Sequence, residues 1–81
     1  MKRKTILITG ASSGIGAGMA REFAANGHDL ALCARRTERL DDLRQELQRK
    51  YGVRVSVRAL DVTDYSQVFE VFEAFAAEFG T

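Results

Sequence analysis

A glycine-rich turn between a strand and a helix constrains the fold of this chain more than any other part of its sequence. The turn, Thr9–Gly16, has the sequence TGASSGIG and follows the apolar segment Ile6–Ile8. A helical pattern begins near Gly14. Glycines let the chain turn tightly and let a phosphate approach the backbone without meeting a Cβ atom. Because the start of a helix offers free N–H groups and a positive dipole end, the turn predicts a phosphate-binding site.

Strands and helices alternate along the rest of the chain. We predict strands at Lys4–Thr9, Asp29–Ala34 and Val53–Leu60, and helices at Gly14–Asn26, from Thr37 to Tyr51, and from Thr63 or Asp64 to about Phe79. Each helix is followed by a residue that suits a left-handed turn, namely Gly27, Gly52 and Gly80. The pattern predicts one α/β domain over residues 1–81, with three parallel strands in the spatial order 3-2-1 and three helices. This is half of a doubly wound Rossmann fold.

Composition excludes several classes of protein. Apolar residues make up 46% of the 81 residues, which is enough for a core, and 12 basic residues nearly balance 11 acidic ones. That balance argues against partners such as nucleic acid or a membrane surface. Cys33 and His28 are the single cysteine and histidine, so neither a disulfide nor a zinc site is expected. The apolar runs are too short for a signal peptide or a membrane span, and we predict a soluble, cytoplasmic protein.

Two of the predicted helices carry distinctive apolar faces. The first helix has a stripe of large residues beside a stripe of small ones that permit close packing, namely Ile15, Met19 and Phe23 beside Gly16, Ala20 and Ala24. The third helix has a broad apolar face that extends from Val68 to Phe79. Two interpretations of that face stay open: it is ordinary core, or part of it packs on elements that these 81 residues do not contain.

Residues suited to a nucleotide follow each of the predicted strands. The first strand leads into the glycine turn, the second into Arg35-Arg36 and the third into Asp61-Val62. The carboxyl ends of parallel strands meet at one edge of a sheet, and ligands bind there. We therefore expect the three loops to form one site.

The spacing of the glycines resembles that of a known family. The common dinucleotide fingerprint is G-x-G-x-x-G, whereas here Thr9 precedes Gly10-x-x-x-Gly14-x-Gly16. This resembles the Thr-Gly-x-x-x-Gly-x-Gly motif of classical short-chain dehydrogenases/reductases. Extended members of that superfamily usually have two residues, not three, between the first two glycines. The resemblance implies a nicotinamide cofactor and hydride transfer between that cofactor and a carbonyl or alcohol.

The resemblance also implies roles for individual residues. In the family, Ser12 and nearby groups, which include Ser13, contact the ribose and phosphates of the adenosine half. The backbone N–H of Ile15 binds the pyrophosphate. The carboxylate of Asp61 accepts a hydrogen bond from the adenine amino group, and the N–H of Val62 contacts the ring. Asp61 has an alternative role as the cap of the third helix.

The residues after the second strand predict the choice of cofactor. A carboxylate about 20 positions beyond the glycines binds a ribose 2′-hydroxyl and favours NAD. This region instead contains Ala34-Arg35-Arg36, in which two guanidinium groups can bind a 2′-phosphate. We therefore predict NADP(H), with Arg35 the better candidate of the two. The alternative is that both arginines are merely solvated or begin the next helix.

A competing motif leads to a different class of enzyme. Gly10-x-Ser12-x-Gly14 also matches the nucleophile elbow of α/β-hydrolases, which would need His28 as its base. A helix of about twelve residues would separate the two side chains by about 18 Å, far beyond the contact that proton transfer requires. We exclude the triad and expect His28 to be an exposed loop residue. Cys33 lies in mid-strand and is expected to be a buried apolar residue.

The resemblance covers the whole chain but only about the first third of a typical family member. The family's later Asn-Ala-Gly segment, catalytic serine and Tyr-x-x-x-Lys pair are absent, because Tyr51 is followed by Val55 and Tyr65 by Phe69 at that spacing. We predict no catalytic residues, no activity for the chain alone, and an open edge at the first strand.

Two interpretations of the function stay open. In the first, the chain is the NADP(H)-binding segment of an oxidoreductase whose full form is a homo-oligomer. In the second, it is a free-standing or complementing nucleotide-binding module without catalysis. The substrate is set by later loops of the family and is not predicted.

Overall fold

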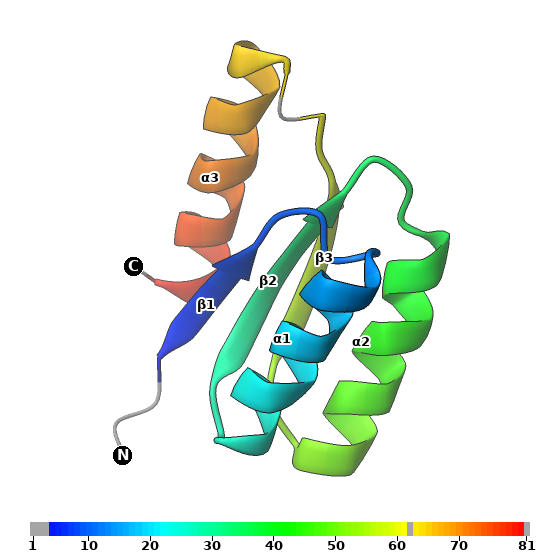
Figure 1. The fold of residues 1–81 in the computed structure, drawn as a ribbon. Helices are drawn as coiled ribbons and strands as arrows, with labels where there is room; N and C mark the ends of the chain where they lie inside the picture. The colour runs from blue at the N-terminus through cyan, green and yellow to red at the C-terminus, as the bar shows by residue number, and fades with distance from the viewer. Residues whose placement is uncertain (1–3, 62, 81) are drawn as a thin grey trace.

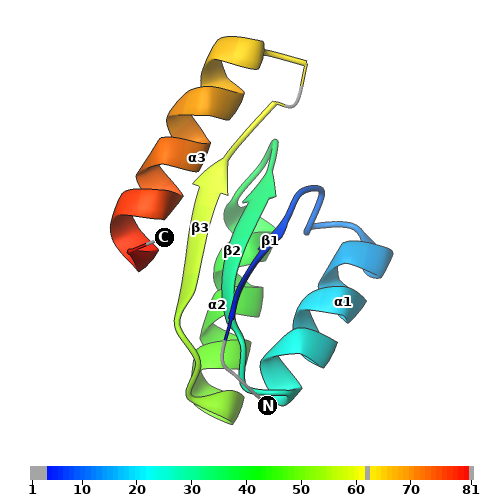
Figure 2. The same ribbon diagram turned by 90° about the vertical axis from the view of Figure 1, so that its left-hand side faces the viewer.

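A three-stranded sheet lies between layers of helices in the computed structural model, which describes residues 4–61 and 63–80 (Figure 1). The elements in chain order are β1 (Thr5–Ile8), α1 (Gly14–Ala25), β2 (Asp29–Ala34), α2 (Glu38–Tyr51), β3 (Val55–Ala59) and α3 (Tyr65–Phe79). Helices α1 and α2 cover one face of the sheet and α3 covers the other (Figures 1 and 2).

The strands lie side by side in the order β1-β2-β3, and both pairs are parallel. Thr5 of β1 is opposite Asp29, and Leu30 of β2 is opposite Val55. The predicted fold class and strand order are therefore confirmed. The two outer strands are shorter than predicted. The first spans Thr5–Ile8 instead of Lys4–Thr9, and the third spans Val55–Ala59 instead of Val53–Leu60.

The central strand β2 is buried along its whole length. Leu30 and Leu32 face the core beneath α1 and α2, whereas Ala31 and Cys33 face the core beneath α3. Neighbouring residues of a strand point to opposite faces, so a strand covered on both faces needs apolar residues at every position. This explains why β2 is apolar at every position after Asp29.

Helix α1 packs against the sheet through its small residues. Gly16, Ala20 and Ala24 are its buried positions, as the sequence predicts. The stripe of large residues lies beside this contact, and its first member, Ile15, has 80% of its surface exposed. Small side chains bring the helix axis close to the sheet and leave the larger ones at the flank of β1.

Helix α2 uses a regular apolar stripe, in which Leu40, Leu43 and Leu47 are buried. Thr37 occupies the cap position at its start, as predicted. Its side chain makes no capping hydrogen bond to the helix. The helix ends at Gly52 in the left-handed conformation, as predicted.

Helix α3 begins at Asp64, whose carboxylate accepts a hydrogen bond from the N–H of Gln67 at 3.2 Å. Val71 and Phe75 are buried against the sheet. Phe72, by contrast, has 51% of its surface exposed. The broad apolar face of α3 is therefore covered only in part among the described residues.

His28 is buried, which corrects the expectation of an exposed loop residue. Its Nδ1 atom accepts a hydrogen bond from the N–H of Lys4 at 3.1 Å, and its ring meets Phe23 edge-on. His28 lies between the end of α1 and the start of β2, and its hydrogen bond holds the backbone of Lys4, which directly precedes β1. The sequence alone does not reveal these contacts, one of which comes from a residue 24 positions earlier in the chain.

Gly16 sits where α1 touches the preceding loop. A Cβ atom at this position would lie 2.6 Å from the carbonyl oxygen of Gly10 and 2.8 Å from the Cα atom of Ala11. Both atoms belong to the backbone, so neither can move aside without shifting the loop. Gly18 on the same helix has nothing within 4 Å of such a Cβ atom.

We expect Gly16→Ala to lower the free energy of unfolding by about 1–3 kcal/mol, because an added methyl group overpacks the contact with the loop. The matched variant Gly18→Ala should raise it by about 0.5–1 kcal/mol, since alanine is the better helix former. Urea unfolding followed by circular dichroism measures both values. Equal effects of the two substitutions would contradict the close contact at Gly16.

Candidate functional site

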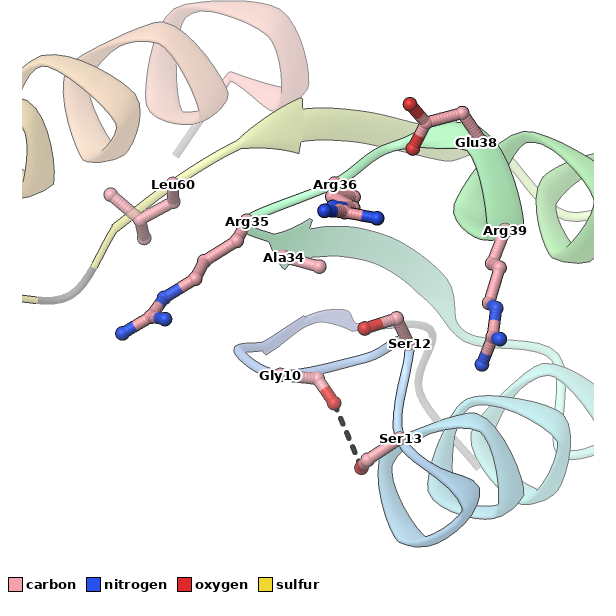
Figure 3. Close-up of a pocket in the computed structure, with 9 residues that line it drawn as sticks. All are labelled: Gly10, Ser12, Ser13, Ala34, Arg35, Arg36, Glu38, Arg39 and Leu60. Atoms are coloured by element: carbon pink, nitrogen blue, oxygen red, sulfur yellow. Dashed lines mark hydrogen bonds between the residues drawn. The ribbon is translucent and has the colours of Figure 1, made fainter.

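A cleft of about 850 Å³ lies at the carboxyl edge of the sheet (Figure 3). The loops after β1, β2 and β3 all contribute to its walls, as the sequence predicts. Its lining residues are Gly10, Ser12, Ser13, Ala34, Arg35, Arg36, Glu38, Arg39 and Leu60. The cleft therefore brings together residues that are up to 50 positions apart in the chain, counted from Gly10 to Leu60.

Two backbone hydrogen bonds hold the three loops together at this edge. The N–H of Ala11 donates to the carbonyl oxygen of Cys33 at 3.0 Å, and the N–H of Leu60 donates to that of Ala34 at 2.9 Å. Both bonds extend the ladder of the sheet beyond the ends of β1 and β3. The loops therefore leave the sheet from fixed positions on either side of β2.

The glycine turn is shaped by Gly10 and Ser13. Gly10 has a φ angle of 63°, in the left-handed region that favours glycine. The hydroxyl of Ser13 donates to the carbonyl oxygen of Gly10 at 2.9 Å and accepts from the N–H of Gly16 at 3.1 Å. Ser13 thus caps α1. The sequence placed Ser13 among the cofactor-binding residues, and the structure shows that its hydroxyl also has this structural role.

Gly14 and Ile15 open α1 directly after Ser13, which lines the cleft. Within residues 4–61 and 63–80, the N–H groups of these two residues donate to no acceptor. A Cβ atom on Gly14 would meet nothing within 4 Å, and Gly14 is not among the glycines with a positive φ angle. Neither packing nor backbone conformation requires glycine at this position. What remains is an open approach to two free N–H groups at the positive end of a helix, which is the usual geometry of an anion site.

Arg35 and Arg36 are exposed and line the cleft after β2. In Figure 3, Arg35 extends outward on the side of Leu60, and Arg36 stands above the cleft nearer to α2. No carboxylate follows β2 until Glu38, which extends away from Arg39 at the start of α2 (Figure 3). The guanidinium groups are therefore available to a ligand.

Asp61 follows Leu60 at the edge of the same cleft. Its carboxylate accepts hydrogen bonds from the hydroxyl of Thr63 at 2.7 Å and from the N–H of Thr63 at 3.0 Å. These two bonds, with a smaller contribution from the charge of Arg35, hold the pKa of Asp61 below its usual value. The capping residue of α3 is Asp64, so the alternative role of Asp61 as that cap is wrong. Val62, which the sequence also predicts, lies outside the described residues.

The cleft contains residues that the sequence analysis missed, and it omits some that were predicted. Glu38 and Arg39 line it, although their place in the next helix gave no motif. Both residues stand at the start of α2, directly after the short loop that carries Arg35 and Arg36. Of the predicted residues, Gly14 and Asp61 do not line the cleft, and Ile15 and Gly16 line a separate groove of about 590 Å³ beside β1.

Other kinds of site find no support in the described part of the chain. It holds no group of three or more histidine, cysteine, aspartate or glutamate side chains that could bind a metal ion. Burial raises the pKa of the Cys33 thiol to about 11, which keeps it protonated and unreactive. Ser12 and His28 lie at opposite ends of α1, so they cannot form a catalytic pair. None of the described helices is long and apolar enough to cross a membrane.

A family profile described as short chain dehydrogenase matches residues 4–81. The chain belongs to the short-chain dehydrogenase family. An uncharacterized oxidoreductase of Mycobacterium tuberculosis is 57% identical over 79 residues, which are 96% of this chain and 31% of that protein. The membership of this family that the glycine spacing indicates is therefore confirmed.

Solved structures of short-chain dehydrogenases share the fold. An alcohol dehydrogenase from Thermococcus sibiricus, in complex with 5-hydroxy-NADP, is 40% identical with a TM-score of 0.94, covering 98% of this chain and 34% of its own. The L-sorbose reductase of Gluconobacter frateurii, in complex with NADPH and L-sorbose, is 40% identical with a TM-score of 0.90, covering 99% and 30%. The chain thus spans about a third of the length of the relatives it matches.

We expect Thr63→Val to raise the pKa of Asp61, because the substitution removes the hydroxyl that stabilises the charged carboxylate and keeps the shape of the side chain. The N–H of residue 63 still donates, so the rise should be partial. Titration of the carboxyl carbon of Asp61 by NMR measures it. Thr37→Val is the matched control and should leave this pKa unchanged. A pKa of Asp61 at or above its ordinary 3.8 in the unsubstituted chain would contradict the assignment.

Proposed function

We propose that this chain is the NADP(H)-binding part of a short-chain oxidoreductase. The observation that carries the proposal is the cleft itself, in which a glycine turn at a helix start faces arginine side chains across the carboxyl edge of the sheet. The relatives from Thermococcus sibiricus and Gluconobacter frateurii, whose structures contain 5-hydroxy-NADP and NADPH, support the same choice of cofactor.

The pyrophosphate of the cofactor would bind at the start of α1. The free N–H groups of Gly14 and Ile15 can donate to its oxygens, and the helix dipole favours its charge. The open space at Gly14 admits a phosphate close to the backbone. Gly10 and Gly16 act indirectly, since they shape the turn that presents these groups.

The adenosine half would lie along the loops after β2 and β3. The exposed hydroxyl of Ser12 and the guanidinium groups of Arg35 and Arg36 can bind a 2′-phosphate. The carboxylate of Asp61, oriented by Thr63, can accept a hydrogen bond from the adenine amino group. The N–H of Asp61 already donates to Gln67, so a contact from the backbone falls to Val62.

The full-length protein would carry out oxidation or reduction of an alcohol or carbonyl substrate. When bound, the nicotinamide supplies or accepts the hydride. Residues 1–81 form the first part of the Rossmann domain, and their task is to bind the adenosine half and so fix the orientation of the cofactor. A homo-oligomer remains our prediction for the full-length protein.

We expect the 81-residue chain to bind NADPH more tightly than NADH. Gly14→Ala should weaken the binding of both by about tenfold or more, because its methyl group occupies the approach of the pyrophosphate to the N–H groups and costs charge-assisted hydrogen bonds. Gly18→Ala, which also adds a methyl group in open space on α1, should leave both affinities unchanged. Nicotinamide fluorescence titration measures the dissociation constants.

Circular dichroism serves as the control that both alanine variants keep the fold. Equal binding of NADPH and NADH by the unsubstituted chain would contradict the choice of cofactor. Unchanged binding in Gly14→Ala would contradict the place of the pyrophosphate.

We also expect the 81-residue chain to show no turnover with alcohols or ketones in the presence of either cofactor. It contains no Tyr-x-x-x-Lys pair to move a proton at the substrate oxygen. Absorbance of the reduced nicotinamide at its characteristic wavelength measures the rate. Turnover above that of cofactor alone would show that another residue of the chain supplies the proton.

A further inference from the structure

Most arginines outside the cleft have an intramolecular partner. Ion pairs join three of them to carboxylates, namely Arg21 to Glu46, Arg44 to Asp41 and Arg58 to Glu78. Arg54 donates to the carbonyl oxygen of Glu78 at 3.0 Å. Among the described residues, those with neither a hydrogen bond nor an ion pair are Arg35, Arg36, Arg39 and Arg49. All of these except Arg49 line the cleft.

Arg39 occupies a position that is unfavourable for the helix that carries it. It lies in the first turn of α2, where the helix dipole favours negative charge and where Glu38 and Asp41 are well placed. Thr37 adds no side-chain cap that would offset this charge. The charge of Arg39 is therefore unfavourable to the helix dipole at this position, and its place in the wall of the cleft suggests a reason for it.

Arg39 reaches the cleft from the side opposite Arg35. It lines both the cleft and the adjoining groove between α1 and α2, and Ser12 is the residue that shares both linings with it. Figure 3 shows its side chain extending toward the start of α1, whereas Arg35 extends outward beside Leu60. The charge of Arg35 is also the smallest of the causes that shift the pKa of Asp61, which follows β3. The positive charges thus stand on two sides of the cleft.

We propose that Arg39 is a specificity-determining residue that binds the phosphate on the adenosine ribose, together with Arg36 and the hydroxyl of Ser12. This inference rests on the proposed function. A guanidinium group can donate two parallel hydrogen bonds to a phosphate, which an ammonium group cannot do. NADH has a hydroxyl in place of this phosphate. Arg39 therefore distinguishes the two cofactors and does not contribute to the affinity for the part of the molecule that they share.

The test compares Arg39→Ala with Arg49→Ala, which removes the same charge at the far end of α2. NADPH and NADH are titrated into each variant and into the unsubstituted chain. For Arg39→Ala we expect the dissociation constant of NADPH to rise by about fivefold or more, as for loss of a hydrogen bond between charged groups. The constant for NADH should change by less than about twofold, as should both constants for Arg49→Ala, because screening weakens distant charges.

A second measurement separates binding from folding. Thermal unfolding of Arg39→Ala without cofactor should occur at the same temperature as in the unsubstituted chain or slightly above it, because a cation has left the positive end of α2. Arg39→Lys should bind NADPH with an affinity between those of the unsubstituted chain and Arg39→Ala, since it keeps the charge and loses the paired donors.

The outcomes distinguish this inference from the proposed function. Failure of the unsubstituted chain to bind NADPH would overturn both. Binding of NADPH by the unsubstituted chain that Arg39→Ala leaves unchanged would overturn only the role of Arg39. Equal loss of affinity for NADPH and NADH would also overturn it, because Arg39 would then act on the part that the two cofactors share.

Discussion

The pairing of β2 with a strand on each side is the constraint on which the rest of the structure depends. Its side chains fill the cores on both faces of the sheet, and its backbone extends the ladder to the loops on both sides. The carbonyl oxygens of Cys33 and Ala34 receive the N–H groups of Ala11 and Leu60 just beyond the neighbouring strands. Three loops therefore leave the sheet at one edge. Without those two bonds, the residues of the cleft would share a side of the molecule but not a fixed geometry.

The three glycines of the turn meet three separate requirements. Gly10 adopts a left-handed backbone conformation, and Gly16 leaves room for the backbone of the loop. Gly14 has neither constraint, because its surroundings are open and its φ angle is ordinary. Two of the glycines are therefore explained by the fold. The third is explained by a ligand that must come close to the start of α1, which is the physical basis of the proposed function.

Much of this arrangement could be predicted from the sequence, since it follows from local rules. The nearly continuous apolar residues of β2 predicted a strand covered on both faces, and the glycines after each helix predicted where the helices end. The features that were missed depend on tertiary contacts. His28 is buried where it contacts Phe23 and the backbone of Lys4, and Ile15 is exposed because Gly16 lets α1 approach the preceding loop closely. Periodicity predicted the close packing of the small residues of α1, but not how far the neighbouring Ile15 would stay exposed.

The cleft gathers positive charge that Glu38 and Asp61 offset only in part. Arg35, Arg36 and Arg39 lie within about one and a half helical turns of sequence, and the starts of α1 and α2 add partial positive charge. Like charges at a surface repel weakly in water and salt, so this grouping lowers the stability of the ligand-free fold.

A phosphorylated dinucleotide would remove that repulsion when it binds. Binding at a hundred times the dissociation constant stabilises a fold by about 2.7 kcal/mol, a large share of what a domain of this size can have. The arginines that weaken the ligand-free chain are then the same groups that make its stability depend on the cofactor. Under the proposed function, folding and cofactor binding would be coupled through this one cluster of charges, at the edge that β2 holds together.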